Sequence, residues 1–205
     1  ENLLSRSPKI QQRLSRLINI ADTKIDSIIV RKRESDDDPS SFFRMPDKKY
    51  DSFMRHFVYE GEDVLGSIEF PLVEESKGTR VLFVLGTLIL IALGRGGVFF
   101  VDEIDTSLHP RIAKFLVMLF QNPKTNPHDA QLIFTTHETT FLDQNVFRKD
   151  QIWFTEKNKH GETELFSVQD FEGVRETTPF EKWYLSGKFG GVPEIKELEF
   201  IFEDE

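Results

Sequence analysis

The stretch that most constrains the fold runs from Val98 to Pro110, where an apolar run leads directly into a cluster of acids. The run Val98 to Val101 has the length and composition of a buried strand, and Asp102 and Glu103 follow it at once. A parallel strand that is buried on both faces delivers the residues after its carboxyl end to the crevice where α/β proteins bind ligands. We therefore expect such a strand here, with its acids facing a cation. An ordinary solvated strand end is the alternative.

From Thr79 onward, helical and strand patterns alternate along the chain. A long apolar helix over Val81 to Leu93 is followed by the strand at Val98, a helix opened by Pro110, the strand "QLIFT" and another short helix. This alternation predicts an α/β core with parallel strands.

The flanking segments follow other patterns. Residues 3 to 20 have the spacing of an amphipathic helix. "DSIIVRKR", Phe53 to Glu60 and Gly66 to Leu72 indicate a small antiparallel sheet, with "GEDVLG" as a turn and "ESDDDPSS" as an exposed acidic loop. "DQIWFTEK" and "ETELFSV" around "NKHG" indicate a C-terminal hairpin, followed by a short helix that ends near Gly187.

Charge and composition exclude several classes of protein. The 205 residues carry 26 Lys and Arg against 35 Asp and Glu, a net charge of -9, so the chain as a whole does not favour binding to nucleic acid or an anionic membrane. Cysteine is absent, which excludes disulfides, cysteine-ligated zinc and thiol catalysis. We find no signal-peptide pattern at the start. The apolar stretch from Val81 to Leu93 is shorter than the roughly 20 residues of a membrane span. We expect a soluble, cytoplasmic protein.

Two further segments contain groups suited to phosphate. In "EESKGTRVLF", Ser76, Gly78 and Thr79 stand at the start of the long helix, where free N–H groups and the helix dipole attract anions. An ordinary helix cap explains the same residues. In "QLIFTTHETTFLD", a strand ends in Thr-Thr-His, which places His137 beyond the carboxyl edge beside Asp102 and Glu103. A neutral imidazole there can contact a γ-phosphate or hold water, although a single histidine after a strand is also common on surfaces.

Taken in order, these motifs resemble the ABC-type ATPase domains. The similarity is greatest to the AAA-type ATP-binding proteins of abortive-infection and other phage-defence loci, which are close to SMC-like and DNA-repair ATPases. "ESKGT" resembles their signature motif, "VFFVDE" the Walker B strand, "IDTSLHP" the D-loop and "FTTHETTFLD" the switch-histidine segment. The resemblance extends from about Phe53 to Ile195. It implies an α/β fold that is the C-terminal part of an ABC-type P-loop NTPase: parallel core strands with helices, preceded by a small antiparallel β segment and ending in a hairpin.

The resemblance also implies roles for individual residues, with ATP and Mg²⁺ as cofactors. Asp102 would position Mg²⁺, Glu103 would be the general base, and His137 would contact the γ-phosphate. The signature residues are Ser76, Gly78 and Thr79, the last in place of a glutamine usual in transporters. They would reach ATP in a second copy of the domain, because such domains sandwich two nucleotides in a homodimer. The D-loop residues Asp105 and Ser107 would couple the two sites across that interface.

One motif of the family is missing. No G-x-x-x-x-G-K-[ST] phosphate loop occurs in the sequence, and the glycines of "LGRGG" follow a helix, where they act as a cap and turn. We expect this chain to be the C-terminal part of a longer protein whose Walker A half precedes Glu1. Alone, it should bind ATP weakly and hydrolyse it negligibly. A separately encoded effector is a further expected partner, and the family's output is expected in anti-phage defence or in processes directed at DNA or RNA.

The expected organisation has three parts. Residues 1–72 form a helix and an antiparallel β segment, residues 73–150 form the ATPase core, and residues 151–205 form the C-terminal hairpin and tail. Two other functions remain open. One is a metal-dependent nuclease, in which Asp102, Glu103, Asp105 and His137 hold divalent ions directly. The other is a partner-binding module without catalysis. A zincin is excluded, because Phe141 stands where "HETTF" would need a second histidine.

Overall fold

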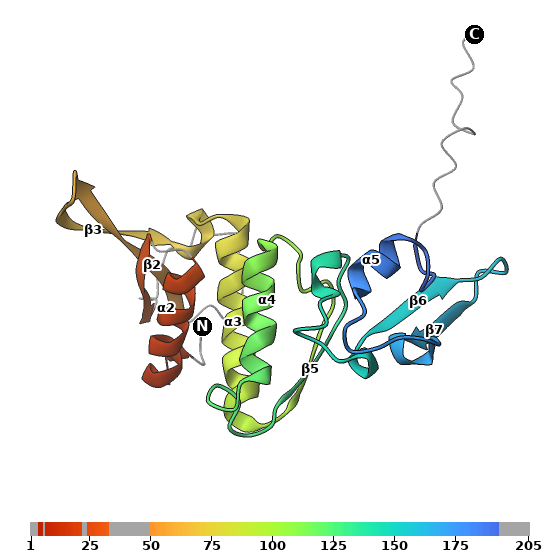
Figure 1. Cartoon of the computed structure of the whole chain (residues 1–205). Coiled ribbons are helices and arrows are strands. Elements are labelled where there is room, and N and C mark those ends of the chain that lie inside the picture. Colours follow the sequence, from red (N-terminus) through yellow and green to blue (C-terminus); the bar gives the residue numbers. More distant parts are fainter. Residues whose placement is uncertain (1–3, 6, 22–23, 33–49, 193–205) are drawn as a thin grey trace, which may run out of the picture. The chain divides into compact units, whose positions relative to one another are not determined.

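The chain is divided into two compact units, Glu1–His137 and Glu138–Glu205. The computed structural model describes residues 4–5, 7–21, 24–32 and 50–192. The acidic stretch "ESDDDPSS" and the end of the C-terminal tail lie outside these residues. Parallel and antiparallel sheets both occur, so the fold is of the mixed α/β type (Figure 1).

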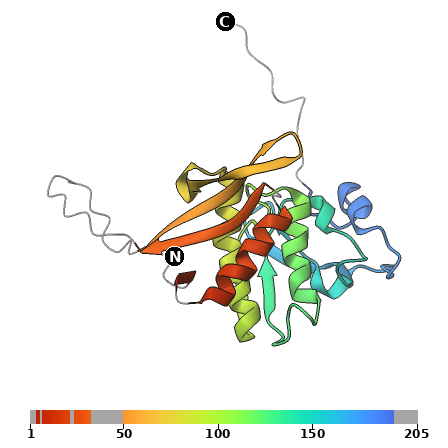
Figure 2. The ribbon, with the colours of Figure 1, turned by 90° about the vertical axis from the view of Figure 1, so that its left-hand side faces the viewer.

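The first unit opens with helix α2 (Pro8–Ala21), which packs on strand β1 (Ile25–Lys32) and on a later helix, as Figure 2 shows. Its buried face carries Leu14, Leu17 and Ile18, in agreement with the predicted amphipathic helix. Two polar side chains on α2 fix β1: the Gln11 amide donates to the Ile28 carbonyl (2.8 Å), and the Ile28 N–H donates to Ser15 Oγ (3.0 Å).

Strands β1, β2 (Tyr50–Glu60) and β3 (Asp63–Pro71) form the predicted antiparallel sheet, in the order β1-β2-β3. The predicted turn "GEDVLG" was wrong in its extent, because β3 already begins at Asp63. Glu60 pairs with Asp63, so only Gly61 and Glu62 make the turn, with Gly61 at φ +61°. A glycine in the left-handed region allows a two-residue hairpin loop, and a bulge between Val58 and Tyr59 absorbs the irregularity in register.

Helix α3 (Lys77–Arg95) follows a single turn of 3-10 helix, η1 (Leu72–Glu74), and contains the predicted long apolar helix. By length and composition alone, α3 could cross a membrane, and it is the only helix among the described residues that passes this test. The buried core helix of a soluble protein passes the same test. Helix α3 packs against α2 and also contacts α4 and β4, and its buried side chains include Leu82, Phe83, Leu85, Ile89 and Leu93. We therefore interpret α3 as a core helix.

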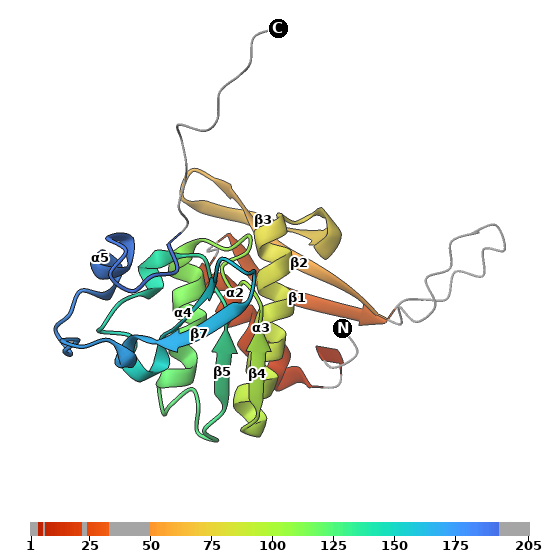
Figure 3. The same ribbon diagram turned by 90° about the vertical axis from the view of Figure 1, so that its right-hand side faces the viewer.

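Strands β4 (Val98–Val101) and β5 (Gln131–Phe134) are parallel, joined through helix α4 (Pro110–Gln121), as the alternating pattern predicted. They lie side by side and point the same way (Figure 3). The expectation that β4 is buried on both faces was wrong. Val98 and Phe100 on β4 are 54% and 69% exposed, and Ile133 on β5 is 51% exposed. Helix α3 contacts β4 and helix α4 contacts β5. The face of the sheet that carries Val98, Phe100 and Ile133 is open to solvent.

The second unit holds the predicted C-terminal hairpin, strands β6 (Trp153–Lys157) and β7 (Thr163–Ser167), and the predicted short helix α5 (Phe180–Leu185). Gly187, at φ +76°, follows the end of α5. The short helix expected after "QLIFT" is a single 3-10 turn, η2 (Thr139–Phe141). The core of this unit is small: Ile152, Val168, Val174, Phe180 and Phe189 are buried together, and partly buried aromatic side chains pack against them.

Candidate functional site

The carboxyl ends of β4 and β5 bring together the acids and the histidine that the sequence placed at two strand ends. Val101 and Phe134 are paired, and the Thr135 N–H donates to the Val101 carbonyl (3.0 Å), so the chain leaves both strands at the same edge. Asp102 and Glu103 follow β4, and His137 follows β5. All three side chains are exposed, which leaves them accessible to a ligand.

Thr135 joins the two strand ends through one hydroxyl. Thr135 Oγ1 donates to Asp102 Oδ1 (2.6 Å) and accepts the backbone N–H of Glu103 (2.8 Å). The carboxylate of Asp102 is thereby oriented while its second oxygen stays available. No role was predicted for Thr135. The available signal was a hydroxyl residue directly after a strand whose parallel neighbour ends in acids.

Glu103 has one carboxylate oxygen engaged and one facing His137. Thr106 Oγ1 donates to Glu103 Oε2 (2.9 Å), whereas Glu103 Oε1 lies 3.7 Å from Nε2 of His137. The latter distance is longer than a hydrogen bond. The His137 side chain is 86% exposed. A water molecule or an oxygen of a ligand can therefore reach both groups.

The segment from Glu103 to Ser107 is a tight turn with a strained backbone. Among the described residues, three non-glycine residues have positive φ, and two of them are Glu103 (φ +48°) and Ser107 (φ +63°). Such conformations cost roughly 1–3 kcal/mol each and concentrate at functional sites. The turn is fixed by the burial of Ile104 and by Thr136 Oγ1, which donates to Asp105 Oδ1 (2.6 Å). Asp105 is therefore held by the strand end that leads to His137.

Ser76, Gly78 and Thr79, the predicted signature residues, lie at the start of α3, where Ser76 caps the helix. Ser76 Oγ accepts the N–H of Thr79 (3.1 Å) and lies 2.8 Å from Thr79 Oγ1, and the Thr79 side chain is buried. Gly78 has a separate steric role, because a Cβ there would lie 2.9 Å from the carbonyl oxygen of Ser107. The start of α3 and the turn after β4 are therefore in close backbone contact.

Two groups of predicted site residues can thus be distinguished in the first unit. A cavity of about 170 Å³ is lined by Ser76, Gly78, Thr79, Ser107 and His109, among others, and its lining does not include Asp102, Glu103 or His137. His109 also caps α4, since its Nδ1 accepts the N–H of Arg111 (3.2 Å). The signature residues and Ser107 face one hollow, whereas the acids and His137 face solvent at the strand ends.

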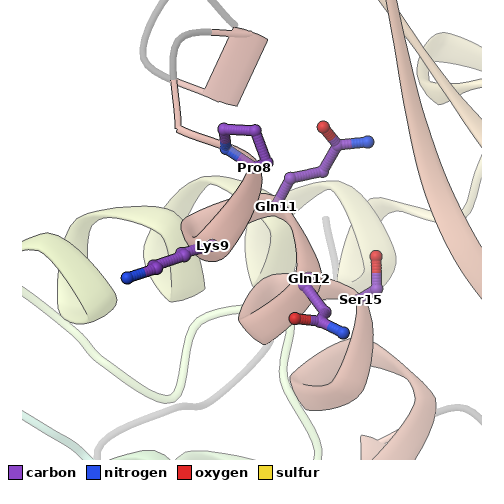
Figure 4. A pocket seen from close by; sticks show the side chains of 5 residues that line it. All are labelled: Pro8, Lys9, Gln11, Gln12 and Ser15. Carbon is purple, nitrogen blue, oxygen red and sulfur yellow. The ribbon is translucent and has the colours of Figure 1, made fainter.

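The described residues contain no group of three or more His, Asp or Glu side chains that could hold a metal ion. The four residues of the nuclease hypothesis, Asp102, Glu103, Asp105 and His137, therefore do not converge on one ion, and Asp105 is bonded to Thr136 instead. Another hollow lies on α2 and is lined by Pro8, Lys9, Gln11, Gln12 and Ser15 (Figure 4). It contains no carboxylate or histidine, so it offers none of the chemistry of the strand ends.

The parallel strands flanked by helices, with acids at their carboxyl edge, place these side chains where α/β domains bind their ligands. Residues 3–143 match the family described as "AAA domain, putative AbiEii toxin, Type IV TA system", so the chain belongs to this family of ATPase domains. The matched range includes every predicted site residue. It ends before β6, β7 and α5.

A solved structure has a similar fold. It is described as "Structural biochemistry of ATP-driven dimerization and DNA stimulated activation of SMC ATPases", and it matches with a TM-score of 0.52 and 14% sequence identity. The match covers 91% of this chain and 94% of the other. The fold similarity therefore extends beyond the first unit, and the two chains are of similar length. No curated protein matches this sequence.

Proposed function

We propose that this chain carries the Walker B, D-loop, signature and switch-histidine parts of an ABC-type ATPase, within the C-terminal part of that fold. The observation that supports this most directly is the array at the strand ends, where Thr135 links Asp102 to Glu103 and His137 faces Glu103 at 3.7 Å. Residues 73–150 would be the ATPase core, with residues 1–72 leading into it and residues 151–205 forming a C-terminal hairpin and tail.

The residues at the strand ends fit Mg²⁺ bound together with a nucleotide. Mg²⁺ usually keeps several waters and takes only one or two carboxylates in addition to phosphate oxygens, so a site without three protein ligands is suitable. Asp102 has one oxygen bonded to Thr135 and would hold the ion through the other. When bound, Mg²⁺·ATP supplies the γ-phosphoryl group and neutralises the charge that develops on it.

The other two side chains would act on the water and on the phosphate. Thr106 engages one oxygen of Glu103 and fixes the carboxylate, so its other oxygen is free to orient an attacking water and accept its proton. His137 Nε2 faces this free oxygen of Glu103 and would donate a hydrogen bond to the γ-phosphate or hold the water. Because both groups are exposed in this chain, the site needs a further segment to exclude bulk solvent.

The open face of the β4–β5 sheet supports the need for such a segment. Parallel sheets are normally covered on both faces, yet Val98, Phe100 and Ile133 are more than half exposed. We propose that the segment that carries the phosphate-binding loop covers this face. That position would bring its loop to the edge where Asp102 and Glu103 lie. No phosphate loop occurs in the 205 residues themselves.

The signature residues would act on the nucleotide of a second copy. Ser76, Gly78 and Ser107 surround a hollow that is separate from the acids, which suits an arrangement where each copy completes its partner's site. The solved relative is described by ATP-driven dimerisation. We propose the same ATP-driven homodimer for this protein in the cytoplasm, with a separately encoded effector and a role in anti-phage defence. The net charge of this chain gives no support to nucleic-acid binding.

The proposal is tested by ATP hydrolysis with and without the phosphate-binding segment. The 205-residue chain alone should hydrolyse ATP negligibly. The assembled protein, which is this chain together with the phosphate-binding segment, should hydrolyse ATP and dimerise. Glu103→Gln in the assembled protein should abolish hydrolysis and retain the ATP-bound dimer. Glu172→Gln, at an exposed acid of the second unit, is the matched control and should behave as wild type. Turnover by the isolated chain at roughly 1–100 s⁻¹, the usual range for phosphoryl transfer, would refute the proposal.

A further inference from the structure

A histidine–carboxylate pair in the first unit stands outside the proposed catalytic groups. His56 lies on β2 and Glu75 lies between η1 and α3, and His56 Nε2 is 2.7 Å from Glu75 Oε1. The two side chains are only 21% and 10% exposed. The His56 ring also contacts Phe70 on β3 edge-to-face, with 5.3 Å between ring centroids. The imidazole is therefore fixed by both strands of the β2–β3 hairpin.

The carboxylate of Glu75 depends on this contact. An ionised carboxylate only accepts hydrogen bonds, so Nε2 of His56 must be the donor. A mostly buried carboxylate without a hydrogen-bond donor would be left with an uncompensated desolvation cost. The pair therefore holds Glu75 at one place relative to the β2 strand.

The position of Glu75 determines where the signature residues begin. Glu75 directly precedes Ser76, the cap of α3, and its N–H donates to the Leu72 carbonyl (3.3 Å). On the other side, Gly78 approaches the carbonyl of Ser107 so closely that a Cβ would lie at 2.9 Å. The signature turn, residues 75–78, therefore contacts β2 through Glu75 and lies close to the turn after β4 at Gly78.

We propose that His56 is a positioning residue for the signature turn. Through its hydrogen bond to Glu75, His56 fixes the position of Ser76 and Gly78 relative to the nucleotide of the second copy. This inference rests on the proposed function, because it requires that the signature residues act across a dimer. It assigns His56 no contact with ATP and no part in binding nucleotide within its own copy.

Two variants that differ by one methylene test the link in the assembled protein. The amide nitrogen of glutamine at position 56 can occupy the place of Nε2, whereas the asparagine amide reaches only the place of Nδ1. His56→Gln should therefore keep the bond to Glu75 and His56→Asn should lose it. We expect His56→Asn to weaken ATP-driven dimerisation and to lower kcat by about tenfold, which corresponds to about 1.4 kcal/mol. His56→Gln should remain within about threefold of wild type.

If His56 only stabilised the fold, His56→Asn would not weaken dimerisation while the affinity of the monomer for ATP stayed unchanged. The affinity of the monomer for ATP should be unchanged in both variants, because the signature turn acts on the other copy. Thermal unfolding establishes that each variant is folded. If His56→Asn does not fold, Glu75→Asp tests the link from the other side, since it keeps the charge and withdraws the carboxylate from Nε2.

The outcomes separate this inference from the proposed function. If the wild-type protein does not dimerise with ATP, the proposed function fails. If the wild type dimerises and His56→Asn does so equally well, only the role of His56 is refuted. Equal impairment of His56→Gln and His56→Asn also overturns it, because the bond to Glu75 would then not be the cause.

Discussion

Replacing Thr135 by valine would remove the one hydroxyl that joins the ends of β4 and β5. Two hydrogen bonds would be lost, one donated to the carboxylate of Asp102 and one accepted from the Glu103 N–H. A bond to a charged group contributes about 1.5–3 kcal/mol and a neutral one about 0.5–1.5 kcal/mol. Because the site is exposed, water replaces part of both, so we expect a loss of about 1–2 kcal/mol in the free energy of unfolding.

Urea unfolding of the 205-residue chain measures this loss. With a slope of about 2 kcal/mol per molar urea, the midpoint should fall by roughly 0.5–1 M. Thr135→Ser keeps the hydroxyl and removes only a methyl group, so its midpoint should stay close to that of wild type. Thr140→Val, at an exposed threonine of η2, controls for the introduction of an apolar surface group. If all three variants unfolded at the same urea concentration, the hydroxyl would not organise this edge.

Three further predictions concern other positions. Gly78→Ala should destabilise the chain by about 1–3 kcal/mol, because its Cβ would lie 2.9 Å from the Ser107 carbonyl. Gly94→Ala, in open space on the same helix, should stabilise by up to about 1 kcal/mol, and similar urea midpoints for the two would contradict the steric argument. Asn126→Ala should lower the free energy of unfolding by about 2–4 kcal/mol, because the buried side chain bonds the Phe120 carbonyl and both backbone groups of Ala130. Urea unfolding measures this loss, and a value below about 1 kcal/mol would show that water replaces these bonds. The side-chain hydrogen bond from Arg148 holds the pKa of Asp150 below its usual range. Any stabilisation from this pair is therefore present above the pKa that Asp150 has in the unfolded chain, and it is lost as the pH falls through the lower pKa of Asp150 in the folded chain. NMR titration should show that Arg148→Ala raises the pKa of Asp150, and an unchanged pKa would assign the shift to another group.

The ends of β4 and β5 show what local sequence can predict. The apolar run Val98 to Val101 was predicted as a strand with its bounds correct, because four apolar residues between glycines and acids leave little alternative. The parallel pairing with β5 followed from the helix between the strands. The proximity of Asp102, Glu103 and His137 then followed, since parallel strands end at the same edge.

Three features could not be predicted, each for a physical reason. The bridge through Thr135 depends on the register of two short strands, which their mostly apolar residues do not specify. The open face beside Phe100 escaped prediction because a strand buried on both faces and one that leaves a face bare can have the same apolar sequence. The contact of His56 with Glu75 joins residues 19 apart, through a packing of β2 on the segment around η1 that no local pattern encodes.

The bare face of the β4–β5 sheet has a consequence for how the protein is made in the cell. Val98, Phe100 and Ile133 present apolar surface on a two-stranded sheet whose outer edges have no further strand among the described residues. Such surfaces recruit chaperones or other nascent chains before their proper cover arrives. Recombinant production of this chain alone should therefore give a larger aggregated fraction, and co-expression with the covering segment should raise the soluble yield. A Phe100→Lys exchange should improve the soluble yield of the chain alone and weaken its binding to the covering segment.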